Sequence, residues 1–186
     1  MGDHAITLLK EPQSGADRMT PTFDELFSEH HKKVLLAAYR VTGNLQDAED
    51  VLQSVFLRLL KRRKYLNSGD NPAGYLSKAA INASIDLLRS KRHTQTDTLN
   101  EEIHPSSLGA ADSEARQAEQ RQHLREALLT LEQHAAEVFA LRFFEDFSNV
   151  EIAMLLDTSP NSIAVTLHRT RTRLQEILGE LEGENR

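Results

Sequence analysis

The sequence predicts an all-α protein made of two small helical bundles joined by a flexible linker, with a helix-turn-helix in the C-terminal bundle. Apolar residues recur at intervals of three and four along several segments, which is the period of an amphipathic helix. No segment of useful length alternates apolar and polar residues as a half-buried strand does. A polar stretch without periodicity, residues 94–121, separates the two helical regions. The length of 186 residues fits two units of roughly 60–80 residues each.

The first helix is expected to follow a mobile, polar tail that comprises residues 1–21. Thr22 and Glu25 have the spacing of a capping box, which satisfies backbone N–H groups at a helix start. Gly43 is expected to end this helix, because glycine adopts the left-handed conformation that commonly follows a helix. The apolar positions expected to face the core are Phe23, Leu26, Phe27, Val34, Ala37, Ala38 and Val41.

The second helix carries the strongest periodicity in the chain, and Asn44 is placed to cap it. Residues 65–71 are rich in turn formers and predict a loop. Pro72 then suits the first position of a third helix, which is expected to run to about Arg92. The apolar stripe of the second helix is Ala48, Val51, Leu52, Val55, Phe56, Leu59 and Leu60, and the third helix is expected to bury Leu76, Ala80, Ala83 and Leu87.

The C-terminal half has the pattern of a helix-turn-helix. Helical periodicity returns over residues 118–141, and Ser148 with Glu151 forms a second capping box before a short helix. A tight turn at Asp157 follows, and Ser159 caps a longer helix. In a DNA-reading unit of this shape, the first turns of the longer helix enter the major groove. Spacing alone leaves open the alternative of a plain helical hairpin with a solvated polar face.

Charge is distributed unevenly along a chain whose formal net charge is −6. Residues 23–93 carry 12 basic and 8 acidic side chains, a net charge of +4, whereas residues 122–186 carry 6 and 11, a net charge of −5. Because DNA affinity depends largely on neutralising phosphates, the C-terminal unit should bind DNA poorly unless another body holds it there. This asymmetry disfavours an autonomous repressor and predicts different partners for the two halves.

Several function classes lack support in the sequence. Cysteine is absent, which excludes disulfides and thiolate metal sites. There is no apolar run of the ~20 residues that span a bilayer, and the start does not resemble a signal peptide, so a cytoplasmic protein without membrane insertion is expected. No catalytic residue, metal site or cofactor is expected. A hydrolase that uses Glu29, His30 and His31 is the least favoured hypothesis, because adjacent helical residues point about 100° apart.

The third helix lines up Lys78, Asn82, Asp86 and Arg89 on one face, which is either a solvated face or a track for single-stranded DNA. This helix belongs to one of three stretches that carry a family resemblance: GNLQDAEDVLQSVFLRLLKR, NPAGYLSKAAINASIDLLRSKR and ALLTLEQHAAEVFALRFFEDFSNVEIAMLLDTSPNSIAVTLHRTRTRLQEIL. Together these stretches resemble the extracytoplasmic-function (ECF) group of bacterial RNA polymerase sigma factors. The resemblance covers about residues 22–93 and 122–180.

The resemblance implies a promoter-recognition subunit without an active site of its own. Residues 22–93 would be region 2, which docks on the clamp coiled coil of core RNA polymerase and melts the minus-ten DNA. Residues 122–186 would be region 4, which contacts the polymerase flap and the minus-thirty-five DNA. The family implies an anti-sigma factor as a further partner. The expected polymerase contacts are Asp47, Asp50, Gln53 and Arg58; the expected minus-ten contacts are Asn67, Ser68, Gly69, Asp70, Asn71, Tyr75, Lys78, Asn82, Asp86, Arg89 and Arg92; and the expected minus-thirty-five contacts are Asn161, Ser162, Val165, Thr166, Arg169 and Arg173.

The sequence departs from the family pattern at three positions. The family often carries proline at the position of Glu132 and glycine at that of Asp157, and a lysine common in its recognition helix is Ala164 here. The last change weakens any expectation of the usual minus-thirty-five sequence. The alternative function is an autonomous helix-turn-helix regulator that binds duplex DNA without polymerase.

Overall fold

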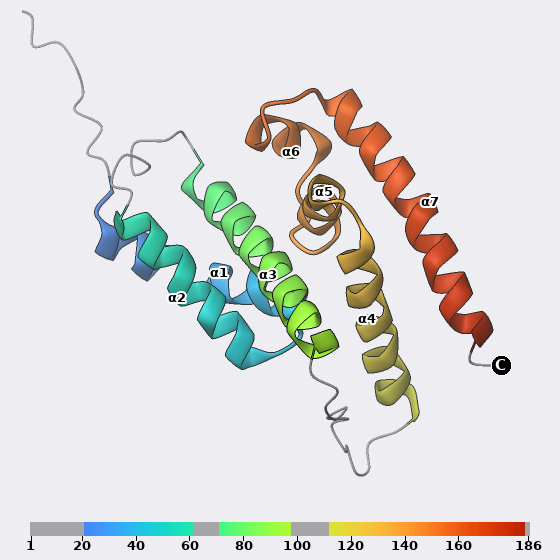
Figure 1. Ribbon diagram of the computed structural model, residues 1–186. Helices are drawn as coiled ribbons and strands as arrows, with labels where there is room; N and C mark the ends of the chain where they lie inside the picture. Colours follow the sequence, from blue (N-terminus) through green and yellow to red (C-terminus); the bar gives the residue numbers. More distant parts are fainter. Residues whose placement is uncertain (1–20, 62–70, 98–111, 185–186) are drawn as a thin grey trace, which may run out of the picture.

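The protein consists of two helical bundles that lie side by side. A computed structural model describes residues 21–61, 71–97 and 112–184, and every secondary-structure element in these ranges is a helix. Figure 1 shows α3 in the middle, with α1 and α2 on one side and α4 to α7 on the other. The helices are α1 (Phe23–Thr42), α2 (Leu45–Lys61), α3 (Pro72–Asp97), α4 (Asp112–Thr130), α5 (Gln133–Phe143), α6 (Asn149–Leu155) and α7 (Pro160–Glu184).

The helix boundaries follow from side-chain caps that the sequence indicated. The capping boxes of Thr22 with Glu25 and of Ser148 with Glu151 both form. Gly43 has φ 68° and follows α1, and the Asn44 side chain accepts a hydrogen bond of 3.1 Å from the N–H of Asp47 at the start of α2. These predictions are confirmed.

The third and fourth helices reach further into the expected linker than the periodicity indicated. The third helix, α3, continues to Asp97 rather than ending near Arg92, and α4 begins at Asp112. The segment 94–121 is therefore helical at both of its ends. The remaining stretch of the expected linker, 98–111, lies outside the described residues.

The N-terminal core is formed by α1, α2 and α3, largely from the predicted apolar positions. It includes Leu26, Val34, Val51, Phe56 and Leu76, all buried. One expectation is wrong: Leu60 is 47% exposed, because the apolar stripe of α2 ends one residue earlier, at the buried Leu59. Phe27 is also an exposed residue, although it stacks on Phe23 and meets Phe56 edge-on.

A second core joins α4 to α7 and extends across to the first bundle. Its members include Leu128, Leu141, Ile152, Ile163 and Leu174, from all four C-terminal helices. Val41, Ile81 and Ile85, which belong to α1 and α3, are fully buried in this same cluster. The two bundles therefore share an apolar seam, which the sequence did not predict.

Candidate nucleic-acid interface

The start of α2 presents acidic side chains in two different environments. Asp47 is buried, and its carboxylate forms an ion pair of 2.5 Å with the Lys91 ammonium from α3. Asp50, Gln53 and Arg58 are exposed on the same helix. Of the four expected polymerase contacts, these three side chains are the ones accessible to a large partner, whereas Asp47 is engaged within the bundle.

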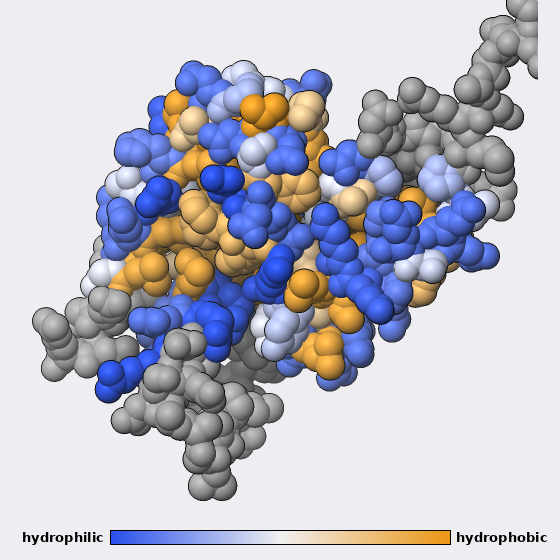
Figure 2. Space-filling view, turned by 180° about the vertical axis from the view of Figure 1, so that it is seen from behind, coloured by the Kyte–Doolittle hydropathy of each residue, from blue (hydrophilic) through white to orange (hydrophobic). Residues whose placement is uncertain are grey.

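Two apolar side chains extend the exposed surface of α2. Leu57 is 54% exposed and Leu60 is 47% exposed, on either side of Arg58 in the sequence. An apolar group with a neighbouring charge is typical of protein-binding surfaces. Leu57 was identifiable in the sequence, because it lies outside the apolar stripe of α2. Figure 2 shows apolar side chains at the surface of both halves, among a mostly hydrophilic exterior.

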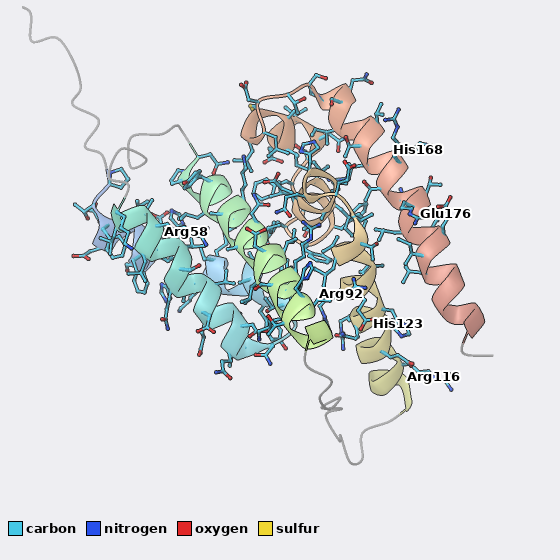
Figure 3. All side chains as sticks on the ribbon, in the orientation of Figure 1. Arg58, Arg92, Arg116, His123, His168 and Glu176 are labelled. Carbon is cyan, nitrogen blue, oxygen red and sulfur yellow. The ribbon has the colours of Figure 1, made fainter. Side chains whose placement is uncertain are left out.

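Arg58 was expected to contact polymerase, but it lies beside residues that were expected to contact the minus-ten DNA. It shares the lining of a cavity of about 280 Å³ with Tyr75, Lys78 and Asn82. The cavity lies between α2 and α3 and combines two cationic groups, an aromatic ring and an amide. Figure 3 shows Arg58 on the outer helix of the N-terminal bundle.

Three of the four residues on the polar face of α3 reach the C-terminal bundle rather than solvent alone. The Lys78 ammonium donates to the backbone carbonyl of Leu155 over 3.2 Å. The Asn82 amide donates to the Glu137 carboxylate over 2.6 Å. The guanidinium of Arg89 donates to the backbone carbonyl of Leu131 and to the side chain of Gln133.

The remaining expected minus-ten contacts have different surroundings. Asp86 and Arg92 are exposed, and Arg92 lies beside α4 (Figure 3). The Asn71 side chain accepts a hydrogen bond of 2.8 Å from the N–H of Gly74, which makes it the cap of α3. The other loop residues expected to capture a base, 67–70, lie outside the described residues.

The C-terminal bundle contains the predicted helix-turn-helix. Helix α6 ends at Leu155, and α7 begins at Pro160 with its Ser162 N–H bonded to the Ser159 hydroxyl over 3.1 Å. Between them, Asp157 adopts φ 52°, the left-handed conformation that a tight turn requires. The buried face of α7 carries Ile163, Leu167, Thr170 and Leu174.

The opposite face of α7 is exposed along the part that a recognition helix uses. Asn161, Ser162, Val165, Arg169 and Arg173 are exposed, and Thr166 is half-buried. The Arg173 guanidinium forms an ion pair of 3.0 Å with Glu176, one turn further along the helix. Figure 3 shows His168 and Glu176 on this outer helix. The arrangement fits a helix that presents polar groups to base edges and cations to phosphates.

The three residues suggested for a hydrolase do not converge: His30 Nε2 lies 3.9 Å from the Glu29 carboxylate, but His31 is turned toward Phe27. His30 is buried, whereas the ring of His31 stacks on Phe27 and its Nδ1 lies 2.9 Å from the Phe27 carbonyl oxygen. Within the described ranges, no group of three or more histidine, aspartate or glutamate side chains is gathered as a metal site requires.

Among the helices of residues 21–61, 71–97 and 112–184, none is both long and apolar enough to cross a membrane.

Comparison with known proteins decides the family. A family model described as sigma-70 region 2 matches residues 26–94, and one described as sigma-70, region 4 matches residues 121–174. The RNA polymerase sigma factor CarQ of Myxococcus xanthus is 33% identical over 169 residues, which cover 90% of this chain and 95% of CarQ. The ECF RNA polymerase sigma factor SigE of Mycolicibacterium smegmatis is 26% identical, over 92% of this chain and 67% of SigE. This chain belongs to the ECF group of sigma factors.

A solved structure supports the fold of this sigma factor. The chain resembles the sigma factor RpoE in the co-crystal structure with the anti-sigma factor NepR from Bartonella quintana, with a TM-score of 0.51. The likeness covers 84% of this chain and 96% of RpoE at 21% sequence identity. This likeness confirms the predicted all-α fold, and the sequence comparisons confirm the predicted family.

Proposed function

We propose that this ECF sigma factor binds core RNA polymerase, directs it to specific promoters and helps to melt the minus-ten DNA. Polymerase binding is assigned to the exposed part of α2, centred on Asp50, Gln53 and Arg58. The clamp coiled coil is the proposed contact for this surface, and the flap is the proposed contact for the C-terminal bundle. The protein acts in the cytoplasm, where polymerase and promoter DNA are found, and has no active site of its own.

The observation that carries the proposal is a helix-turn-helix with an exposed recognition face in a unit of net charge −5. Net repulsion between this unit and DNA phosphates opposes binding, so a larger body must hold the recognition helix at the duplex. Core polymerase supplies that body in the proposed function. The polar groups of α3 supply donors for an opened strand, with Tyr75 and Arg58 beside them for stacking and charge.

An anti-sigma factor is proposed as the regulatory partner. The related RpoE was crystallised with one, NepR. The exposed apolar residues of α2, Leu57 and Leu60, are suitable for such a partner, because a protein that covers them also blocks the proposed polymerase contact.

The deciding experiment measures binding of the full chain to bacterial core RNA polymerase by size-exclusion chromatography. The test variant is Asp50→Arg, and the matched control is Glu126→Arg, an equal charge change at an exposed position of α4. We expect tight binding by the wild type and the control, and loss of binding by Asp50→Arg. Equal binding by all three proteins would place the docking surface elsewhere.

The alternative of an autonomous regulator predicts a different result. The folded chain would then fail to bind core polymerase but would bind duplex DNA alone, with Asp50→Arg leaving DNA affinity unchanged or improved. The exposed face of α7 is compatible with this alternative, and the polymerase-binding assay separates the two functions.

A further inference from the structure

The exposed face of α7 has an apolar residue at its centre. Val165 is 42% exposed, although the residues two positions before and after it, Ile163 and Leu167, are buried in the core. Because each residue of an α-helix turns the chain by about 100°, Val165 points about 200° away from Ile163, to the opposite side of the helix. This valine therefore lies outside the hydrophobic core of the bundle.

Two polar side chains lie on the same side of α7 as Val165. Asn161 precedes Val165 by four residues and His168 follows it by three, and both are exposed. Residues at this spacing form one row along a helix. Figure 3 shows His168 on the side of α7 that faces away from α4 and α5. We call Asn161, Val165 and His168 the reading row.

Cations flank the reading row on both sides. By the period of the helix, Arg169 and Arg173 lie along one edge of the row and Arg171 lies along the other, and all three are exposed. A helix that enters a DNA groove has a phosphate backbone on each side of it, and arginine is a common phosphate contact. An apolar centre with cations along both edges therefore favours DNA over a protein as the ligand of this face.

The first turns of α7 lack the side chains that most often read guanine. Residues 160–168 contain neither arginine nor lysine, whose bidentate contacts to guanine are the commonest specific contacts in protein–DNA complexes. Asparagine makes the corresponding bidentate contact to adenine, and an apolar side chain contacts the C5 methyl group of thymine. The composition of this segment therefore favours A·T pairs where Asn161 and Val165 meet the base edges.

We propose that the minus-thirty-five element of this sigma factor contains an adenine read by Asn161 and a thymine whose C5 methyl group contacts Val165. The inference rests on the proposed function, because it uses the assignment of α7 to promoter DNA. Asn161 and Val165 are about 6 Å apart along the helix axis, so the two bases are expected about two base pairs apart. His168 is the third specificity-determining residue, and its imidazole N–H donates to the N7 atom of a purine on the far side of the thymine.

The first test removes a methyl group from the DNA and leaves the protein unchanged. The wild-type holoenzyme selects a promoter from random DNA, and each thymine of the minus-thirty-five region is then replaced in turn by deoxyuridine, which lacks only the C5 methyl group. We expect one replacement to lower the affinity of the holoenzyme about fourfold, the effect of losing one buried methyl group. A selected element without thymine, or equal affinity after every replacement, would overturn the proposal.

The second test asks whether Val165 makes the methyl contact. In Val165→Ala the ratio of affinities for the thymine and deoxyuridine duplexes should fall from about four towards one, and Val165→Thr, which keeps one methyl group, should retain part of the ratio. The matched control is Val150→Ala on α6, a valine that is 54% exposed, and it should keep the wild-type ratio. An unchanged ratio in Val165→Ala would refute the contact even if the overall affinity fell, because a role in folding or in a protein contact weakens binding to both duplexes alike.

A repeated selection from random DNA tests His168. The holoenzyme of His168→Ala should select an element with the same adenine and thymine but without the preference for a purine beyond the thymine. The matched control is His134→Ala, the same change at an exposed position of α5, and it should select the wild-type element. An element that keeps the purine in His168→Ala would refute the assignment of His168.

Failure of the inference and failure of the proposed function give different results. Selection of a promoter that is insensitive to deoxyuridine would refute the thymine contact and leave the sigma factor function intact. Failure of the wild-type chain to select any promoter together with core polymerase would instead refute the proposed function on which the inference rests.

Discussion

Lys91 of α3 and Asp47 of α2 form an ion pair of 2.5 Å that ties the C-terminal part of one helix to the first turn of the other. The Asp47 side chain is 10% exposed and that of Lys91 is 51% exposed. Asp47 also has its backbone N–H bonded to the Asn44 side chain. An acidic residue expected to face polymerase is therefore also a connection within the N-terminal bundle.

Substitution of Asp47 should reduce stability as well as any polymerase contact. Removal of its charge in Asp47→Asn leaves the Lys91 ammonium without its partner, and we expect a loss of about 1 kcal/mol, modest because Lys91 is half exposed. Asp50→Asn, at an exposed position of the same helix, should change stability by less than about 0.5 kcal/mol. Urea denaturation followed by circular dichroism measures both. Unchanged stability in Asp47→Asn, with weaker polymerase binding, would instead indicate a direct contact.

The turn of the helix-turn-helix depends on the left-handed conformation of Asp157, at φ 52°. Asp157→Val should destabilise the protein by about 1–2 kcal/mol, because a β-branched side chain is strained there. Asp157→Gly should be close to neutral, since relief of strain is offset by the greater entropy of the unfolded chain. Thermal unfolding of the two variants checks the order. A valine variant as stable as the wild type would contradict the role of this conformation.

The exposed face of α7 should divide into residues that read sequence and residues that bind phosphate. Asn161→Ala should weaken holoenzyme binding to a selected promoter by about 1–3 kcal/mol and relax preference at one base pair. Arg173→Ala should weaken binding to all sequences alike and lower the salt dependence by about one phosphate contact. Filter binding over a salt series distinguishes them. Equal effects on selected and scrambled duplexes in both variants would refute the base-reading assignment.

Acid should weaken the two capping boxes. The backbone N–H of Thr22, followed by its hydroxyl, lowers the pKa of Glu25 from its ordinary 4.5, and the hydroxyl and N–H of Ser148 lower that of Glu151. A carboxyl with a lowered folded pKa contributes stability above its unfolded pKa and loses it as the pH falls through the folded value. The melting temperatures of wild type and Glu151→Gln should differ at pH 7, and the difference should shrink as the pH falls below the ordinary pKa of 4.5. A constant difference across this range would contradict the prediction.

Local chemistry accounts for how well the helices could be predicted. A capping box, a left-handed glycine or a proline at a first helical position acts within one turn of chain, so residues such as Thr22, Gly43 and Pro72 mark boundaries without tertiary contacts. The exposed face of α7 could be predicted in the same local way, because buried and exposed positions recur along a helix with a fixed period.

Prediction was less complete for α3, which is buried on two sides. The periodicity indicated one apolar face with Leu76 and Ala80, and that face does pack against α1 and α2. Ile81 and Ile85 lie on another face and are buried by the C-terminal bundle, although the sequence left them unassigned. The polar residues between these faces were interpreted as DNA contacts or as a solvated surface, and nothing local indicated that α5 would meet them.

The sequence by itself determined the all-α class, the caps, the helix-turn-helix and, through its resemblance, the sigma factor family. Tertiary structure alone decided that Asn82 meets Glu137, that Lys91 meets Asp47, and that the two bundles share an apolar seam. The physical reason is the range of the interactions. Caps and periodicity act over three or four residues, whereas the partner of a buried polar group is chosen by how whole helices pack, across separations such as the 55 residues between Asn82 and Glu137.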